Sequence, residues 1–335
     1  IYSIRGMDGA AVTDARRGFA LFDDVLTRMG LAFALMFDGQ YAEGLAYFEA
    51  RFPYKMPGFL NLPWPRWDGS RVPSLAIMVE MGLGDVLSFA RFVDEAARRV
   101  DRVFLQVQPE LLTLLAPVWG DDGAVTVVAN DYVLPEVSAW CPYFSLPVTL
   151  GLTDDEIRGW PGIDVGRFGC AGPPEMVPEM GFNVAIAWAG SPANDIDQHR
   201  SIPVTAFLPL ADVPGVRLFS VQVGPRVKEL HDAGMAPLVR DLAPWIKDAR
   251  DTAAILRRCD LVVTCDTFVG HLAGALGKDC WVLTAYRGGD WRLGRTGDKA
   301  LWYENHTLFR QGPDCRWEPV FDRVVKALRG KCARS

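Results

Sequence analysis

Residues 261–277 read LVVTCDTFVGHLAGALG, an apolar run followed directly by a helical one. The first part, 261–266, has the composition of a buried strand that ends in polar residues, and 269–277 has the composition of a helix. A strand that passes straight into a helix is typical of parallel βαβ units, in which ligands bind at the carboxyl ends of the strands. This junction is therefore the first candidate for a binding site.

The same alternation extends to both sides of the junction. We expect a strand at 279–285 and a last helix at about 317–329. On the N-terminal side, strands are expected at 183–190 and 216–224, with a helix at 252–260. The pattern predicts one doubly wound parallel sheet.

A second series of strands and helices precedes this one. It contains expected strands at 74–80, 103–107 and 124–129, separated by helices at about 85–99 and 109–115. Two such series in 335 residues predict an α/β protein with two Rossmann-like domains, each a doubly wound parallel sheet.

The N-terminal segment is helical instead. Residues 15–51 carry apolar side chains at helical spacing, and the sequence DGQ at 38–40 predicts a turn between two helices. Gly44 and Ala46 among large neighbours are similar to the small-large alternation of one tetratricopeptide unit, and an ordinary helical hairpin fits the pattern equally well. A connector rich in proline and tryptophan follows at 53–67.

Composition excludes several classes. The net charge of −6 argues against a general nucleic-acid binder, and no apolar run approaches the roughly 20 residues of a membrane-spanning helix. Seven cysteines, an odd number without C-x₂-C spacing, predict neither a disulfide framework nor a zinc site. Reduced thiols and no visible signal peptide favour the cytoplasm, including the periphery of the inner membrane.

Three places concentrate polar and glycine residues at expected strand ends. In the first, Gly82 and Gly84 permit a tight turn and close approach to a ligand, and Asp85 follows them. Asp85 stands where an N-cap belongs, and its carboxylate is also suited to removing a proton from a hydroxyl. Taken locally, capping is the simpler explanation.

The second place is the junction at 261–277 itself. Asp266 and Thr267 end the expected strand, and the amides at the start of the next helix suit a diphosphate. His271 lies in the first turn, where Gly270 permits close packing. The plainer interpretation is a capped helix with a buried histidine. The joint occurrence of these four residues favours ligand binding.

The third place follows the first strand of the second series. Ser191, His199 and Arg200 lie in the loop after 183–190, the usual position of a phosphate-binding loop. Arg200 has the planar, permanent charge that suits phosphate, although a solvated loop arginine is the commoner case. Gln222 ends the next expected strand and is a candidate to reach a ribose or base.

These motifs, in their order, resemble a known family. They are similar to the glycosyltransferase domain found behind bacterial tetratricopeptide repeats. The matching stretches are WDG at 67–69, GLGDVLSFARF at 82–92, WAGSP and HRSIP within 188–203, SVQVGP at 220–225, DTAAIL at 251–256 and CDTFVGHLAGALGK at 265–278. That domain is similar to the ADP-heptose:lipopolysaccharide heptosyltransferase family. The resemblance covers roughly residues 30–325.

The resemblance implies a GT-B fold, with two Rossmann-like domains facing a cleft. The expected domains are an N-terminal tetratricopeptide-like hairpin at 1–60, an acceptor-side domain at 61–172, a nucleotide-sugar-binding domain at 181–310, and a C-terminal helix at 311–330 that could cross back over the domain interface. The resemblance also implies a nucleotide-sugar donor as substrate, no cofactor, no metal and inverting transfer.

The resemblance assigns roles by position. Asp85 matches the general base, which reverses the local preference for a cap. Arg200 matches a basic residue that meets the donor diphosphate, and Asp266, Thr267, Gly270 and His271 match the nucleotide-binding turn. The remaining donor-side candidates are Gly82, Gly84, Ser191, His199 and Gln222.

The expected function is transfer of a sugar from a nucleotide-diphosphate donor to a hydroxyl of a glycan, a lipid-linked glycan or a protein. The alternative is a catalytically inactive nucleotide-binding or scaffolding module that recruits a protein partner through its N-terminal helices. A sugar-nucleotide epimerase or dehydrogenase is disfavoured, because the first strand is not followed by G-x-G-x-x-G and no Tyr-x₃-Lys pair is evident.

Overall fold

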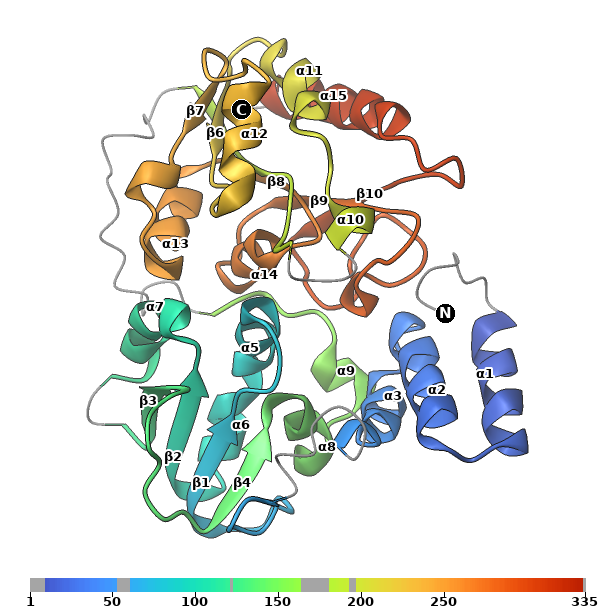
Figure 1. The fold of residues 1–335 in the computed structure, drawn as a ribbon, viewed down its shortest axis with the longest axis vertical. Coiled ribbons are helices and arrows are strands. Elements are labelled where there is room, and N and C mark those ends of the chain that lie inside the picture. The colour runs from blue at the N-terminus through green and yellow to red at the C-terminus, as the bar shows by residue number, and fades with distance from the viewer. Residues whose placement is uncertain (1–9, 53–60, 121–122, 164–180, 193–196, 334–335) are drawn as a thin grey trace.

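The computed structural model describes residues 10–52, 61–120, 123–163, 181–192 and 197–333. They form two α/β units, with three N-terminal helices beside them (Figure 1). Part of the proline-rich connector, residues 53–60, and most of the segment 161–181 between the two units lie outside the described residues.

The first unit holds a four-stranded parallel sheet in the order β3-β2-β1-β4. Its strands are β1 (Val72–Met78), β2 (Val100–Val107), β3 (Val125–Ala129) and β4 (Ala139–Pro142). Its helices are α5 (Leu83–Phe89), α6 (Val93–Ala97), α7 (Pro109–Trp119), α8 (Leu146–Leu150) and α9 (Asp154–Ile157). The helix expected at about 85–99 is interrupted by a 3₁₀ turn at Ala90–Phe92.

The second unit holds a six-stranded parallel sheet in the order β7-β6-β5-β8-β9-β10. Numbered within the unit, this is 3-2-1-4-5-6, the order of a dinucleotide-binding fold. The strands are β5 (Phe182–Ala187), β6 (Val216–Ser220), β7 (Val239–Asp241), β8 (Leu261–Cys265), β9 (Cys280–Thr284) and β10 (His306–Arg310).

The central strands of this sheet are buried along their whole length, and so they are continuous apolar runs in the sequence. Every residue of β5, β8 and β9 is buried. Helices on both faces of a parallel sheet produce this pattern. Three strands were not expected: β4 and β7 have only four and three residues, and β10 begins with a histidine.

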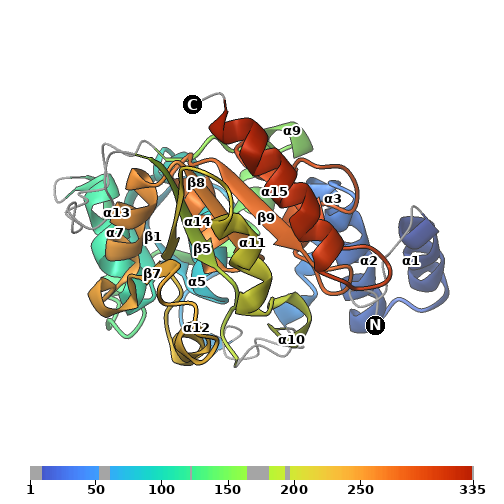
Figure 2. The ribbon, with the colours of Figure 1, turned by 90° about the horizontal axis from the view of Figure 1, so that it is seen from above.

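Helices cover the second sheet. They are α10 (Asp197–Arg200), α11 (Leu208–Ala211), α12 (Lys228–Asp232), α13 (Ala249–Arg258), α14 (Phe268–Ala275) and α15 (Glu318–Cys332). The last helix, α15, contacts α11 and β10, and its buried residues join the core of the second sheet (Figure 2). It therefore lies on the unit that contains it.

The N-terminal helices are α1 (Ala10–Leu21), α2 (Val25–Phe37) and α3 (Tyr41–Phe48). Helices α2 and α3 approach closely at Gly44, where a Cβ atom would lie 2.7 Å from Cγ of Met36. Helix α3 packs on α8 and α9, and α2 packs on a 3₁₀ turn at Trp291–Leu293 in the second unit. The helical segment thus contacts both α/β units.

The two units meet through helices. Helix α5 packs against α14, and α7 packs against α13, where Oγ1 of Thr113 donates to Oδ2 of Asp248 at 2.7 Å. The carboxyl ends of both sheets face this contact (Figure 1). The predicted α/β class with two parallel sheets is confirmed. Within the described part of the chain, no helix combines the length and apolarity needed to cross a membrane.

Candidate functional site

The site lies where the strand order reverses in each sheet. In the first sheet this point is beside β1, which leads into α5; in the second it lies between β5 and β8, which lead into the loop after Ala187 and into α14. Ligands of doubly wound sheets bind at such points. The packing of α5 on α14 brings the two points together.

Asp85 is held from both sides. It stands in the first turn of α5, and its Oδ2 atom accepts a hydrogen bond from the backbone N–H of Gly82 at 3.1 Å. Its Oδ1 atom accepts from Nη2 of Arg292 at 2.7 Å. The side chain remains 29% exposed, so the carboxylate can still be approached from solvent. The N-cap residue of α5 is Gly82, and not Asp85 as the sequence suggested; Asp85 stands at the third helical position and bonds back to the N–H of Gly82, which leaves its other oxygen to the second unit.

Arg292 follows β9 and is almost completely buried, with 3% of its side chain exposed. Its Nη1 atom donates to Asp290 at 2.9 and 3.1 Å. Burial opposes the charged form of Arg292, but the carboxylates of Asp290 and Asp85 outweigh it and raise the pKa of Arg292 above its ordinary value. The cation therefore links a carboxylate of each unit.

Asp290 continues the network toward α14. Its Oδ2 atom lies 3.5 Å from Nε2 of His271, and Nδ1 of His271 lies 2.8 Å from the hydroxyl of Tyr303. Burial of Asp290 opposes its ionisation, but Arg292 and His271 hold the pKa of Asp290 well below its usual range. The chain Asp85–Arg292–Asp290–His271 thus runs from α5 in the first unit to α14 in the second.

Asp266 directly follows β8 and is 6% exposed. Burial, together with the nearby carboxylate of Asp290, raises the pKa of Asp266 to about 6, although Arg200 and His271 lower it. Thr267 is the N-cap residue of α14, and its hydroxyl lies 3.2 Å from that of Thr264. The predicted nucleotide-binding turn is therefore compact and buried.

The loop after β5 is organised by Asp197, which is 3% exposed. Its carboxylate accepts from the N–H of Gly190 at 2.9 Å, from Oγ of Ser201 at 2.9 Å and from Nε of Arg200 at 3.3 Å. A Cβ on Gly190 would lie 2.5 Å from both Arg200 and Asp197, so glycine is needed there. Asp197 thus fixes the orientation of Arg200.

The other two candidates of this loop, Ser191 and His199, are placed beside it. Ser191 is exposed, and His199 is half-buried with its Cβ close to Gly288 of the loop after β9. The loops that follow β5 and β9 therefore lie against each other at the carboxyl edge of the second sheet.

Gln222 is used by the protein itself. Its carboxamide oxygen accepts from the N–H groups of Trp188 and Ala189 at 3.1 and 3.0 Å, and its nitrogen donates to the carbonyl of Ala189 at 3.1 Å. The side chain is 5% exposed. Gln222 thus braces the start of the loop that carries Arg200.

Asp290, Arg292 and Asp197 were not found from the sequence. One signal was available for the first two: both follow β9, and ligands gather where parallel strands end. Asp197 gave no such signal, because a short polar loop contains many residues of its type.

A group of three side chains has the donor atoms for a cation. The ligand atoms of Asp266, His271 and Asp290 all lie within 4.8 Å of one another. However, Arg292 already holds both oxygens of Asp290, and Tyr303 holds the second nitrogen of His271. The guanidinium of Arg292 therefore already supplies a permanent positive charge beside these three side chains.

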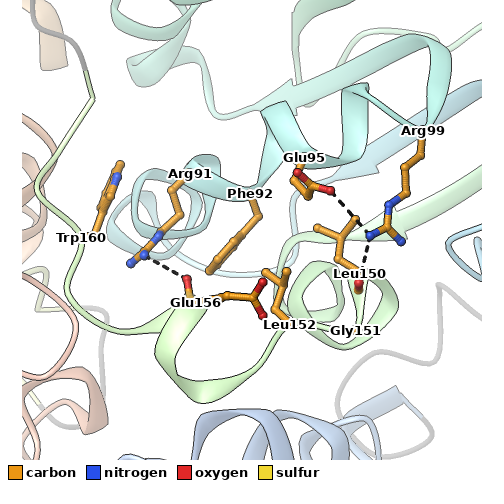
Figure 3. A pocket seen from close by; sticks show the side chains of 9 residues that line it. All are labelled: Arg91, Phe92, Glu95, Arg99, Leu150, Gly151, Leu152, Glu156 and Trp160. Atoms are coloured by element: carbon orange, nitrogen blue, oxygen red, sulfur yellow. Dashed lines mark hydrogen bonds and ion pairs between the residues drawn. The ribbon is translucent and has the colours of Figure 1, made fainter.

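A separate pocket of about 580 Å³ lies on the flank of the first unit (Figure 3). Arg91 and Arg99 stand at its two ends with apolar side chains between them, and Glu95 and Glu156 also line it. Burial lowers the pKa of Arg91 to about 10. The pocket shares no lining residue with the network around Asp85; Arg99 pairs with Glu95 at 3.6 Å, and Arg91 donates to the backbone carbonyl of Glu156 at 3.5 Å.

Comparison with known proteins shows which solved structures have a similar fold. No family model matches the chain. A curated relative, Protein FlbA of Caulobacter vibrioides, is 24% identical over 341 residues, which cover 92% of this chain and 55% of that protein. The chain thus spans about half the length of this relative.

Solved glycosyltransferase structures share the arrangement of the chain. The glycosyl transferase family 9 protein from Veillonella parvula has 12% identity and a TM-score of 0.51 over 79% of this chain and 98% of its own. E. coli heptosyltransferase WaaC with ADP-2-deoxy-2-fluoro heptose has 14% identity and a TM-score of 0.51, covering 77% of this chain and 99% of its own.

A third structure is the E. coli dodecameric iron-containing heptosyltransferase TibC in complex with ADP-D-beta-D-heptose. It has 12% identity and a TM-score of 0.52 over 79% of this chain and 77% of its own. At these identities the likeness defines a fold class, and the fold of this chain is that of the two-sheet glycosyltransferases.

Proposed function

We propose that this protein is a GT-B glycosyltransferase that moves a sugar from a nucleoside-diphosphate donor to an acceptor hydroxyl, with inversion and without a metal. The observation that carries the proposal is the meeting of Asp85 with the carboxyl edge of the second sheet, through the 2.7 Å contact to Arg292. One carboxylate from the first unit thereby faces the predicted anion site of the second.

In the proposed reaction, the donor diphosphate lies at the N-terminus of α14 and beside Arg200. The amides and dipole of a helix N-terminus favour an anion, and the guanidinium adds a permanent charge. Asp197 supports this role because its Oδ1 atom accepts a charged hydrogen bond from Nε of Arg200 at 3.3 Å.

Asp85 acts as the general base in this scheme. Its carboxylate accepts the proton of the acceptor hydroxyl while the hydroxyl oxygen attacks the anomeric carbon from the face opposite the nucleotide. The bond from that carbon to the diphosphate oxygen breaks, and the nucleoside diphosphate leaves with the electron pair. Arg200 and the helix amides stabilise the charge that develops on it.

We expect the reaction to need no metal, because Arg200 supplies a positive charge beside the proposed diphosphate site. Charge on a leaving diphosphate can be stabilised by arginine as well as by a divalent ion. Arg200 lies near Asp266, the carboxylate that follows β8, and lowers its pKa. We therefore expect full activity in EDTA.

The proposed acceptor is a glycan, a lipid-linked glycan or a protein, and the proposed location is the cytoplasm or the inner face of the membrane. The N-terminal helices offer a surface for a protein partner: Leu21, Phe22 and Leu26 at the end of α1 and the start of α2 are 63–75% exposed.

The test is a screen of ADP-, GDP-, UDP- and CMP-linked sugars by calorimetry and by release of the free nucleotide, with and without EDTA. ADP-sugars come first, since two of the similar structures were solved with ADP-heptose compounds. We expect the sugar donors of one nucleotide to bind and to be turned over in the presence of EDTA. Binding without turnover of any donor would favour an inactive nucleotide-binding module, and no binding at all would refute the proposal.

A further inference from the structure

Arg292 joins the two units at the candidate base. One arm of its guanidinium reaches Asp85 in α5 at 2.7 Å, and the other holds Asp290, two residues earlier in its own loop, at 2.9 Å. The backbone N–H of Arg292 also donates to Oδ1 of Asp290 at 2.8 Å. The arginine is therefore held by its own loop in the second unit as well as by its contact with the first.

Aromatic rings enclose the same guanidinium. Its central carbon lies 4.3 Å from the ring centroid of Trp291 and 5.4–5.5 Å from those of Phe89, Phe144 and Trp302. Two of these rings, Phe89 and Phe144, belong to the first unit. With 3% of the side chain exposed, Arg292 has little room to take another rotamer.

Asp85 does not have this rigidity by itself. On the side of the first unit, its carboxylate accepts a hydrogen bond from the N–H of Gly82, and the side chain is 29% exposed. A carboxylate offers about four acceptor positions. With one oxygen on Gly82 and the other on Arg292, Asp85 keeps capacity for an acceptor hydroxyl in a fixed orientation.

We infer that Arg292 is the positioning residue of the candidate base, so that Asp85 becomes a competent base only when the two units are in contact. This inference rests on the proposed glycosyltransferase function. Arg292 acts through Asp85 and not on the donor, because both terminal nitrogens of its guanidinium lie on carboxylates. The remaining nitrogen, Nε, has no hydrogen-bond partner among the described residues, and it is buried away from the surface. Arg292, in the second unit, thereby fixes the orientation of the Asp85 carboxylate in the first unit.

A merely structural brace would behave differently. Loss of a brace lowers stability and affects donor binding and turnover together. Loss of a positioning residue lowers kcat and leaves the KM for the donor unchanged, since the donor contacts stay in place. A misplaced base can cost about 100-fold in rate.

The experiment compares Arg292→Ala, Arg292→Lys and Arg292→Gln with the wild type, using the donor that the screen identifies. We expect kcat to fall about 100-fold in Arg292→Gln with the donor KM unchanged. Added guanidinium salt should restore part of the kcat of Arg292→Ala, by filling the space of the lost group. The matched control is Arg287→Gln, which changes an exposed arginine of the same loop. We expect this variant to keep the kcat and the donor KM of the wild type.

A second variant guards against misfolding. Arg292→Lys keeps the charge and should fold, but one ammonium cannot hold two carboxylates in the fork geometry of a guanidinium. We expect its Tm to stay near that of the wild type while kcat falls. Wild-type kcat in Arg292→Gln, or a fall in donor affinity equal to the fall in kcat, would overturn the inference while leaving the transferase proposal intact. A wild-type protein that turns over no donor would refute both.

Discussion

A methyl group on Gly84 would lie 2.3 Å from Cδ2 of His271. The backbone of α5 therefore approaches the imidazole so closely that only glycine fits, and this contact sets the separation of Asp85 from α14. The glycine that the sequence suggested for a ligand turn thus also lies in the contact between the two units.

Gly84→Ala should therefore push the units apart. We expect a loss of about 1–3 kcal/mol in unfolding free energy, because the added carbon overpacks a rigid contact. Turnover should fall as well, since Asp85 moves away from Arg292. Urea unfolding and steady-state kinetics measure the two effects. Gly18→Ala is the control: it places the same methyl in open space within α1 and should stabilise slightly. Equal behaviour of the two variants would contradict the close contact.

Asp85→Asn should lower kcat by about 10²–10⁴-fold while calorimetry with the nucleotide shows unchanged affinity. The amide keeps the shape of the side chain but cannot accept a proton at neutral pH. A variant with wild-type turnover would remove Asp85 from the mechanism.

Arg200→Ala should weaken the binding of the nucleoside diphosphate by about 10- to 100-fold, the value of a charged hydrogen bond. Asp197→Asn should have a smaller effect in the same direction, because it loosens the loop that orients Arg200. Isothermal titration measures both. Arg329→Ala, an exposed arginine on α15, serves as the control. Identical isotherms for Arg200→Ala and the control would show that the diphosphate binds elsewhere.

Asp266 should make the free protein less stable as pH rises through the acid range. Its folded pKa of about 6 exceeds its ordinary value of 3.8, so the folded state holds a proton that the unfolded state releases between about pH 4 and pH 6. The shift corresponds to about 3 kcal/mol, fully lost above pH 6. Relative to the wild type, Asp266→Asn should gain this amount between pH 4 and pH 7 in urea unfolding. A constant difference across that range would mean that Asp266 titrates normally.

Tyr41 should be essential to the loop that carries Arg292. It is fully buried, and its ring packs edge-on against Trp291 and Trp302 at centroid distances of 5.5 and 5.4 Å. Tyr41→Ala should cost about 3–5 kcal/mol in unfolding free energy. Tyr41→Phe is the matched control and should be neutral or stabilising, because the hydroxyl is buried with no hydrogen-bond partner among the described residues. Equal losses in the two variants would mean that the hydroxyl, not the ring, matters.

Much of this architecture could be predicted from the order of residues alone. Strands such as β5, β8 and β9 are buried on both faces, so they appear as continuous apolar runs between helices. The glycine and acidic residues that follow β1 and β8 pointed to the carboxyl ends of the sheets for the same reason. The short edge strands β4 and β7 could not be predicted, because three or four residues carry too little pattern.

Only the tertiary structure revealed the pairing of Asp85 with Arg292, the enclosure of that arginine by rings of both units, and the use of Gln222 as a brace. These contacts join residues as far as 207 positions apart. Local periodicity records which face of an element is buried but not which distant side chain lies against it. Partners of that kind are set by how the two sheets and the N-terminal helices pack, and this packing depends on the whole chain at once.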